Sequence, residues 1–377
     1  VVGGVADDVV AGLRRLGPVV ERPNTYGAGT GVTYLAEHLK VVWESLVTGA
    51  GAAVLLHAFV QDAEMAGDRV GRLVVATKAG LARVDAAVVV DASGDADVCH
   101  FAGLGYELAG ELEPAQTLTT TFRLVNVDLE RRRAVGTDRL HALMRQAAES
   151  GAYDLPRRDG SDHVTPVEGM TATIMTRLES TRGDGRRLRN ATDPVLLTEA
   201  EMAGRRQALE YVRFLVDRVP GYERARLAAL STQVGVRETR RVHGDARLTA
   251  DDVLSARQFD DQVGLCGAPI EDHHPGTGTT WRYLPDGQAV GIPFGTLVAR
   301  DAGNVLVAGR CFSATHDAHA SVRSMAQCMA MGQAAGTAAA LAATRRVDLR
   351  DLPFERLRSA LRDAGAVLTP DLATAAP

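Results

Sequence analysis

The stretch Gly303-Asn304-Val305-Leu306-Val307-Ala308-Gly309-Arg310 decides which fold this chain can adopt. Residues 305–308 are apolar and rich in valine, which is typical of a short strand buried on both faces. Gly309 ends that strand. A helix is predicted over residues 321–343, and its inner side consists of small residues that can lie very close to a sheet: Ala326, Ala330, Gly332, Ala334, Ala335, Gly336, Ala338 and Ala339.

The order of strand, glycine turn and helix has a chemical consequence. The unpaired N–H groups of a helix N-terminus point toward whatever lies beyond the strand end, and they favour negative charge. The sequence therefore predicts a place that can hold an anion or an electron-rich ring.

A second stretch has the same organisation. Residues 86–90 are expected to form a buried strand, within a longer strand over residues 82–91, that runs into Asp91-Ala92-Ser93-Gly94-Asp95-Ala96-Asp97. Ala, Ser and Gly allow close approach of another group to the backbone. The alternative is an ordinary strand-to-helix turn in which Asp95 caps the helix. If both turns serve one ligand, they must meet on one side of a parallel sheet.

A third stretch is Gly235-Val236-Arg237-Glu238-Thr239-Arg240-Arg241, followed by Leu248-Thr249-Ala250-Asp251-Asp252. The arginine-rich run is expected to be extended, with Arg237 facing one side and Glu238 and Arg241 facing the other. Thr249 and Asp252 form a near capping box at a helix start.

Together these three stretches resemble the bacterial FAD-dependent oxidoreductase family of the glutathione-reductase-like flavin fold, which includes relatives of the heterodisulfide reductase flavin subunit. The resemblance covers roughly residues 1–345. It implies an α/β, FAD/NAD(P)-binding fold with an inserted, mixed α+β substrate domain, and FAD as cofactor. It also implies cofactor contacts from Val60, Ala92, Ser93, Gly94, Asp95, Gly309, Arg310, Asp317, Ser321, Val322 and Arg323.

Four residues are candidates for the chemistry: His316, Arg237, Arg240 and His273. A histidine can act as acid or base near neutral pH, although His316 could equally be a surface residue in a helix-entry turn. Arginine suits bidentate recognition of a carboxylate, but a structural ion pair is an equal alternative. Arg323 is expected in the first helical turn, where a cation opposes the helix dipole, so a flavin oxygen, a phosphate or an acidic substrate would hold it there.

The expected opening unit of such a flavoprotein is a strand, Gly-x-Gly-x-x-Gly and a helix. The chain begins Val1-Val2-Gly3-Gly4, which is too short for that strand. The family resemblance instead places a helix like residues 3–16 after the dinucleotide-binding unit. We therefore interpret the N-terminal Rossmann unit as incomplete in this sequence.

The expected organisation has three parts: a flavin-binding domain of residues 1–103 and 296–345, a substrate or cap domain of residues 104–295, and a C-terminal helix and tail of residues 346–377. Gly67-Asp68 predicts a hairpin turn, and Thr198-Glu199-Ala200-Glu201 predicts a helix start. Helices are also expected over residues 35–46, 137–150 and 198–219, and strands over residues 53–60, 70–77, 117–127 and 163–177.

Composition narrows the class of protein. A net charge of -5 over 377 residues argues against a nucleic-acid or anionic-membrane partner. Cys99, Cys266, Cys311 and Cys328 contain no C-x-x-C pair, and two adjacent histidines such as His273 and His274 chelate poorly, so no metal site is expected. Few cysteines fit a reducing cytoplasm.

Three functional interpretations stay open at this point. The first is an oxidoreductase that passes hydride from a small substrate, carboxylate-bearing in one version, to FAD, with a homo-oligomer as one arrangement. The second is a cofactor-free fragment or non-catalytic interaction module. The third is an electron-transfer protein resembling the flavin subunit of heterodisulfide reductase, although the cysteine runs of those relatives are missing from this sequence.

Overall fold

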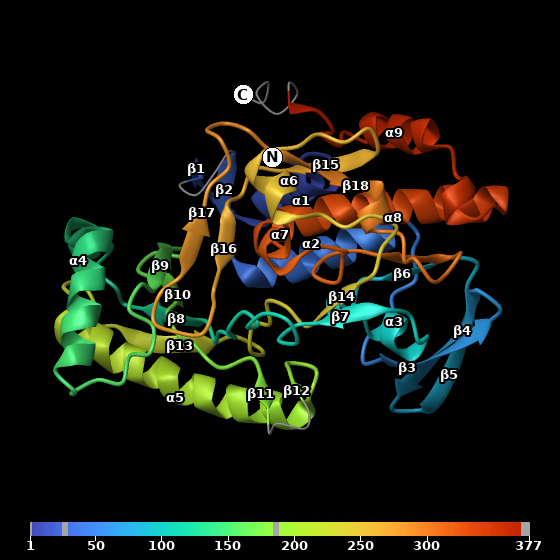
Figure 1. Cartoon of the computed structure of the whole chain (residues 1–377). Helices are drawn as coiled ribbons and strands as arrows, with labels where there is room; N and C mark the ends of the chain where they lie inside the picture. Colours follow the sequence, from blue (N-terminus) through green and yellow to red (C-terminus); the bar gives the residue numbers. More distant parts are fainter. Residues whose placement is uncertain (1, 25–28, 184–187, 371–377) are drawn as a thin grey trace.

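A computed structural model describes residues 2–24, 29–183 and 188–370 of the chain. Figure 1 shows two lobes, with α4 and α5 in one and α8, α9 and the three-stranded sheet in the other. The helices are α1 Val5–Leu16, α2 Ala36–Gly49, α3 Asp97–Phe101, α4 Leu129–Glu149, α5 Pro194–Arg218, α6 Ala250–Leu254, α7 His316–Val322, α8 Met325–Arg345 and α9 Phe354–Asp363.

A parallel pair of strands lies in the lobe of α8. β6 (Val89–Asp91) pairs with β19 (Val305–Val307), in the register Val89 to Val305 and Asp91 to Val307. The Ala308 N–H extends the ladder by donating to the Asp91 carbonyl at 3.0 Å. All three residues of β19 are fully buried, as the apolar pattern predicts.

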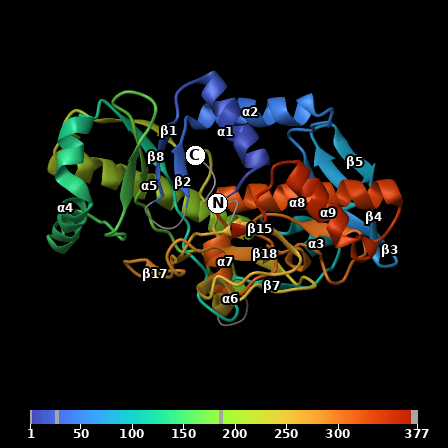
Figure 2. The ribbon, with the colours of Figure 1, turned by 90° about the horizontal axis from the view of Figure 1, so that it is seen from above.

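The helix predicted over residues 321–343 is two helices. α7 ends at Val322, and Ser324 has extended backbone angles (φ -71°, ψ 159°) before α8 begins at Met325. Arg323 is therefore the C-cap residue of α7. The sequence had predicted it in the first turn of a helix, and that prediction is wrong. α8 packs on β15 (Gln262–Cys266) and β6, and α1 packs against the same helix (Figure 2). Ala334, Ala335 and Ala338 are buried as predicted, but Gly332 and Gly336 are exposed.

A three-stranded antiparallel sheet, β3 (Phe59–Ala66), β4 (Arg69–Thr77) and β5 (Gly80–Asp85), precedes β6. The predicted Gly67-Asp68 hairpin is confirmed, because Ala66 pairs with Arg69. The strand predicted over residues 53–60 is wrong for residues 53–58, which pair with no described strand. Leu55 and Leu56 in that segment are 64% and 72% exposed. The strand predicted over residues 82–91 is interrupted and contributes to both β5 and β6.

The other lobe is a four-stranded antiparallel sheet in the order β13 (Arg226–Leu230), β8 (Phe122–Val125), β10 (Thr171–Ile174) and β9 (Ser161–Val164). Helices α4 and α5 cover it, and Phe122, Met144 and Tyr211 are among the fully buried side chains of its core. The single strands predicted over residues 117–127 and 163–177 are shorter: the first is β8, and the second is the β9–β10 hairpin.

Two helix starts test the capping predictions. The Thr249–Asp252 capping box is confirmed at α6. The box at Thr198 is wrong, because α5 begins earlier, where Asp193 accepts from the N–H groups of Val195 and Leu196. Pro194 at the first helical position favours that earlier start, and the Thr198 hydroxyl bonds within the helix, to the Pro194 carbonyl. α4 also begins earlier than predicted, at Leu129, and kinks at Gly136.

The remaining strands form two-stranded sheets. They are β1 (Val20–Pro23) with β2 (Thr30–Thr33), β7 (Tyr106–Leu108) with β14 (Arg240–Val242), β11 (Arg182–Gly183) with β12 (Leu188–Arg189), β15 with β18 (Val290–Pro293), and β16 (Ile270–Asp272) with β17 (Thr280–Arg282).

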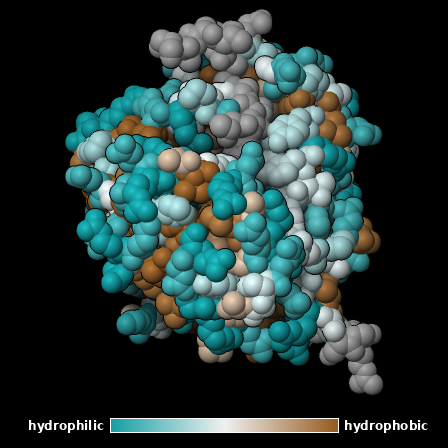
Figure 3. Space-filling model, turned by 90° about the vertical axis from the view of Figure 1, so that its left-hand side faces the viewer, coloured by the Kyte–Doolittle hydropathy of each residue, from teal (hydrophilic) through white to brown (hydrophobic). Residues whose placement is uncertain are grey.

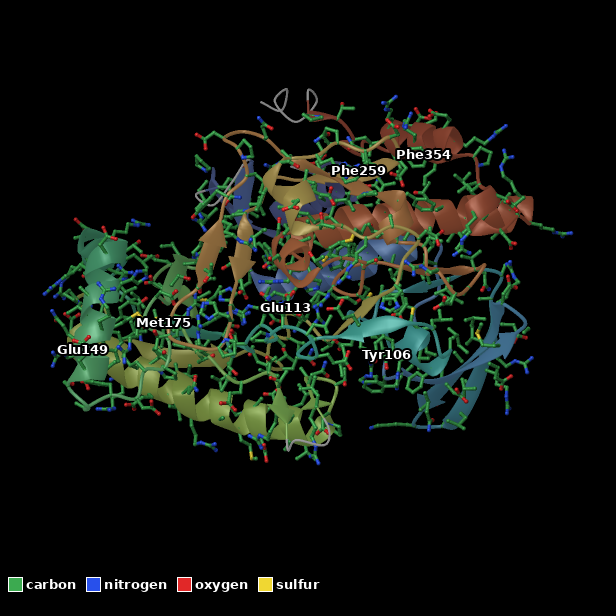
Figure 4. The ribbon with its side chains drawn as sticks, viewed as in Figure 1. Tyr106, Glu113, Glu149, Met175, Phe259 and Phe354 are labelled. Atoms are coloured by element: carbon green, nitrogen blue, oxygen red, sulfur yellow. The ribbon has the colours of Figure 1, made fainter. Side chains whose placement is uncertain are left out.

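The two lobes have separate hydrophobic cores. In Figure 4, Met175 marks the core of the α4–α5 lobe, and Phe354 lies on α9 at the edge of the larger core. The larger core contains residues from both sides of the expected domain boundary at 296, such as Val263, Ile292 and Leu306, and also Leu357 of the C-terminal segment. The domain division stays a prediction, and residues 371–377 of the expected tail lie outside the described residues.

The outer surface of the α4–α5 lobe is mainly hydrophilic, with scattered hydrophobic patches (Figure 3). Within the described ranges, no helix has the length and apolar character needed to cross a membrane.

The Asn304 side chain gives a test of how the parallel pair is held. Its amide accepts from the Val70 N–H at 2.9 Å and donates to the carbonyls of Val70 and Ala87 at 2.9 and 3.1 Å. Asn304→Ala leaves the buried Val70 N–H without its side-chain partner, so we expect a loss of ~1–3 kcal/mol in the free energy of unfolding. Urea denaturation measures it, with the exposed Gln288→Ala as control. Equal stability of the two variants would contradict this role of Asn304.

Candidate functional site

Two turns lie side by side at the ends of β6 and β19. The first is Ala92-Ser93-Gly94-Asp95, and the second is Gly309-Arg310. Because β6 and β19 are parallel and in register, both turns leave the same edge of the pair. The Arg310 guanidinium lies 3.3 Å from the Asp95 carboxylate and so joins them. The sequence-based expectation that the two turns meet is confirmed.

The first turn is held by the buried Asp91 carboxylate. One oxygen accepts from the N–H and hydroxyl of Ser93 at 3.1 and 2.6 Å, and the other accepts from the Cys99 N–H at 3.0 Å. Gly94 has φ +79°, and a Cβ there would lie 2.6 Å from an Arg310 nitrogen. Only glycine fits this turn while Arg310 crosses it.

Asp95 does not cap the following helix. The N-cap of α3 is Ala96, and the Asp97 N–H donates to the Ser93 hydroxyl instead. The Asp95 side chain accepts from the Thr239 hydroxyl at 2.8 Å, and Arg240 donates to the Asp95 carbonyl at 2.8 Å. Arg240 thus supports the turn, and it also bonds Asp97 at 3.0 Å.

A cavity of ≈ 540 Å³ adjoins Arg310, between α1, α2 and the first half of α8. Trp43, Met325 and Met329 give it apolar walls, and Arg310 and Arg323 give it positive charge. Within the described part of the chain, the buried Nη1 of Arg310 and Nε of Arg323 have no hydrogen-bond partner. A cavity with apolar walls and two arginines in its lining fits a ligand that combines a flat ring with anionic groups, as FAD does.

Arg323 connects this cavity to a buried network. It donates to the Gln116 side-chain oxygen at 2.9 Å, and the Gln116 amide donates to Glu238 at 3.1 Å. Since Glu238 only accepts, the orientation of the Gln116 amide is determined. Glu238 is 1% exposed and also accepts from Arg241 and from His316 Nδ1, the latter at 2.9 Å.

His316 lies between two carboxylates. Its Nδ1–H donates to Glu238, and its Nε2–H donates to Asp272 at 3.3 Å. Burial by itself lowers the pKa of His316, but the hydrogen bonds to Asp272 and Glu238 outweigh burial and raise the pKa to about 10. Burial likewise raises the pKa of Glu238, yet His316 and the neighbouring cations hold it below its ordinary value. His316 is buried and cationic at neutral pH, so its reading as a surface residue is wrong.

Two further histidines are buried but neutral. Burial lowers the pKa of His273 to about 4, despite its hydrogen bond to Glu271 at 2.9 Å. Burial lowers the pKa of His319 to about 3, and its Nε2–H donates to the Arg310 carbonyl at 2.7 Å. His319 therefore supports the second turn.

Arg237 lies beside the segment that carries Gln116. Its Nη1 donates to the Thr117 carbonyl at 2.5 Å and to the Thr119 hydroxyl at 2.7 Å. Burial lowers the pKa of Arg237 well below its usual range, and the charges of Arg323 and Arg157 lower it further. Glu238 and Arg241 pair with each other. Strict alternation would place them on opposite faces, so this contact shows that the run is irregular before β14 begins at Arg240.

The side chains of several expected cofactor residues have partners other than the two turns. Asp317 pairs with Arg282 of β17, the Ser321 hydroxyl donates to the Ala268 carbonyl at 2.7 Å, and Val322 is fully buried in the large core. Val60 lies in β3, opposite Val75. No hydrogen bond or ion pair between described residues joins the side chains of Asp317, Ser321, Val322 and Val60 to the two turns. Their cofactor roles stay predictions.

The sequence missed Gln116, Thr239 and Trp43. Each is a single residue without a partner at regular spacing, so no local pattern marks it. Within the described residues, no three His, Cys, Asp or Glu side chains are arranged to hold a metal ion.

A protein-family model matches most of the chain. It is described as FAD dependent oxidoreductase and covers residues 1–361. No curated protein matches the chain.

Solved structures with a similar chain trace include the following three. A triple mutant of the flavin-dependent brominase Bmp2 is 10% identical, with a TM-score of 0.42 and coverage of 95% of this chain and 71% of that one. A geranylgeranyl bacteriochlorophyll reductase-like protein from Thermoplasma acidophilum is 14% identical, with a TM-score of 0.42 and coverage of 90% and 62%. The anhydrotetracycline hydroxylase OxyS from Streptomyces rimosus is 10% identical, with a TM-score of 0.45 and coverage of 94% and 54%.

The chain thus spans between about half and 71% of these solved chains. Residues 1–361 include the two adjoining turns and the cavity beside them, and the family model covers them all. The chain belongs to the FAD dependent oxidoreductase family, and FAD is its cofactor.

Proposed function

We propose that this protein oxidises a small organic substrate by passing hydride to FAD. The observation that carries the proposal is the contact of Arg310 with Asp95 of the Gly94 turn, beside an apolar cavity lined by Arg310 and Arg323. The bound flavin supplies a two-electron acceptor, and the protein positions it and adjusts the charge around it.

The residues that would hold FAD divide by chemistry. Gly94 and Gly309 permit close approach to the backbone at the two turns. Arg310 and Arg323 would donate to anionic oxygens, and Trp43, Met325 and Met329 would contact the apolar part of the group.

His316 would position the site as a fixed cation, because substrate oxidation by hydride loss releases a proton and needs a base to accept it. Its imidazolium keeps a proton on Nε2, next to Asp272, whose side chain is 18% exposed while that of Glu238 is 1% exposed. His273 is neutral at pH 7 and remains a candidate base.

The finer assignments of the sequence stay proposals. These are the glutathione-reductase-like subfamily, a Gly-x-Gly-x-x-Gly unit outside these residues that binds the pyrophosphate, and a cytoplasmic location. Gly332 and Gly336 on α8 are exposed, with open space beside each α-carbon, and Leu55 and Leu56 are exposed just before β3 in the chain. Such surfaces suit further packing.

The electron-transfer interpretation is weaker than the hydride-transfer one. Cys99, Cys266 and Cys311 are fully buried free thiols in separate parts of the sequence, and Cys328 is half-buried. Iron content of the purified protein distinguishes the two interpretations.

The Gly94 turn can be tested by one added methyl group. Gly94→Ala places a Cβ against the Arg310 guanidinium, so we expect flavin affinity to fall about tenfold. Gly103→Ala is the matched control, because Gly103 has a similar φ (+71°) but no atom within 4 Å of the added carbon. Absorbance near 450 nm relative to 280 nm measures flavin content. Equal content in both variants would contradict the role of the turn, and its absence from the wild type would favour the cofactor-free interpretation.

The two carboxylate contacts of His316 predict that its contribution to the stability of the fold depends on pH. A raised folded-state pKa means that His316 stabilises the fold fully below about pH 6.5, its unfolded value, and loses this contribution as the pH rises through about 10. The difference in unfolding free energy between wild type and His316→Asn is therefore expected to shrink between pH 6.5 and 10.5.

Urea denaturation at pH 6, 8 and 10.5 measures this difference. The exposed His57→Asn serves as control. A difference that stays constant over this range would mean that His316 is not a paired cation in the folded protein.

A further inference from the structure

Arg237 has an unused hydrogen-bonding edge. Both of its bonds to described residues come from Nη1, to Thr117 and Thr119. Its Nε and Nη2 bond no described residue, and neither is among the buried atoms that lack a partner. Each of these two nitrogens therefore keeps some accessible surface, and together they offer two parallel N–H groups.

Arg237 also lacks a counter-ion. Among the described residues, neither Arg237 nor Arg323 lies within 4.0 Å of a carboxylate. The pKa of Arg237 is lowered by three neighbouring cations, Arg323, Arg157 and Arg177. Glu271 is the anion that raises it most.

The carboxylates around this group are already engaged. Glu271 bonds His273 at 2.9 Å, and Asp159 bonds Arg157 at 2.8 Å. Asp272 faces the cationic His316. Glu238 and Asp272 also act on Arg323 and Arg177, but both carboxylates are paired with the cationic His316. The four arginines and His316 therefore outnumber the four carboxylates Glu271, Asp159, Glu238 and Asp272, and positive charge is in excess. Such an excess is costly unless an anion joins it.

The other arginines of the group show how an arginine with a structural role finds its hydrogen-bond acceptors. Arg177 donates to the carbonyls of His274, Gly276 and Gly278 at 2.9, 3.0 and 2.7 Å, and it thereby holds the loop between β16 and β17. Arg157 forms an ion pair with Asp159. Arg237 alone of these three combines a fixed guanidinium with a free edge and no carboxylate.

The Arg237 guanidinium is also held in place before any ligand arrives. Thr119 and Gly235 exchange two backbone hydrogen bonds, at 3.1 and 2.7 Å, which join the two segments that carry the acceptors and Arg237. A fixed guanidinium loses little freedom on binding.

We propose that the free edge of Arg237 binds the carboxylate group of the substrate, with Arg323 contributing charge from beside it. This assignment rests on the proposed function and specifies its substrate as a small organic carboxylate. Two parallel N–H groups match the two oxygens of a carboxylate. A phosphate carries a third charged oxygen, which the two N–H groups of one guanidinium edge do not engage.

Calorimetric titration tests this assignment on the purified protein. The probes are acetate, succinate and benzoate, with succinamide as the neutral counterpart and inorganic phosphate as the competing anion. The wild type is expected to bind at least one carboxylate, and Arg237→Gln to bind it at least tenfold more weakly. The control is Arg133→Gln, an exposed arginine on α4, which is expected to bind as the wild type does.

Two further readouts separate a binding role from a structural one. Without a probe, Arg237→Gln is expected to keep its flavin absorbance and to have an unchanged or higher unfolding temperature, because a repelled charge is removed. A lower unfolding temperature with unchanged carboxylate binding would make Arg237 a structural residue.

Other outcomes also overturn the assignment: no carboxylate binds the wild type, phosphate binds more tightly than every carboxylate, or Arg237→Gln loses its flavin and so belongs to the cofactor site. A wild type that binds carboxylate but carries no flavin would instead refute the proposed function and leave the anion site standing.

Discussion

The parallel pairing of β6 with β19 is the constraint on which the site depends. Three residue pairs bring segments more than 200 residues apart into register, and both strands end at the same edge. Asp91 then shapes one turn through its carboxylate and continues the ladder through its carbonyl. Since Asn304 ties the start of β19 to β4, a change at either end of this short pair would move Gly94 relative to Arg310.

Buried charge in this protein falls into two classes. Glu238 is enclosed, and Gln116, Arg241 and His316 all donate to it, so its desolvation is compensated within the chain. Arg237 has backbone and hydroxyl acceptors but no carboxylate. The first class stabilises the arrangement of the site, and the second leaves binding capacity for an anion from outside.

The break between α7 and α8 gives Arg323 its position. A continuous helix over residues 321–343 would place the Arg323 cation in its first turn. That turn is at the positive end of the helix dipole, where a cation is unfavourable. Because α7 ends at Val322, Arg323 lies at the negative end of α7, where a cation is favourable, and directly before the N-terminus of α8. The extended Ser324 thus allows one arginine to reach both the cavity and Gln116.

Features that depend on neighbouring residues could be predicted from the sequence. The apolar run of β19, the Gly67-Asp68 hairpin and the Thr249–Asp252 capping box follow from backbone preferences and local hydrogen bonds. The meeting of the two turns was also predictable, because strand, glycine and helix occur in that order twice and parallel strands end at one edge.

Features that depend on distant partners were decided by the tertiary structure. Asp193 and Pro194 start α5 ahead of Thr198, and residues 53–58 pair with no described strand, although their apolar pattern favours one. The chain from Arg323 through Gln116 and Glu238 to His316 joins residues that are 78 to 207 positions apart. No periodic pattern in the sequence predicts such pairs, because a buried carboxylate accepts from whichever donor the fold brings near it. The sequence therefore determined which residues could carry charge at the site, and packing alone decided which of them kept a free edge.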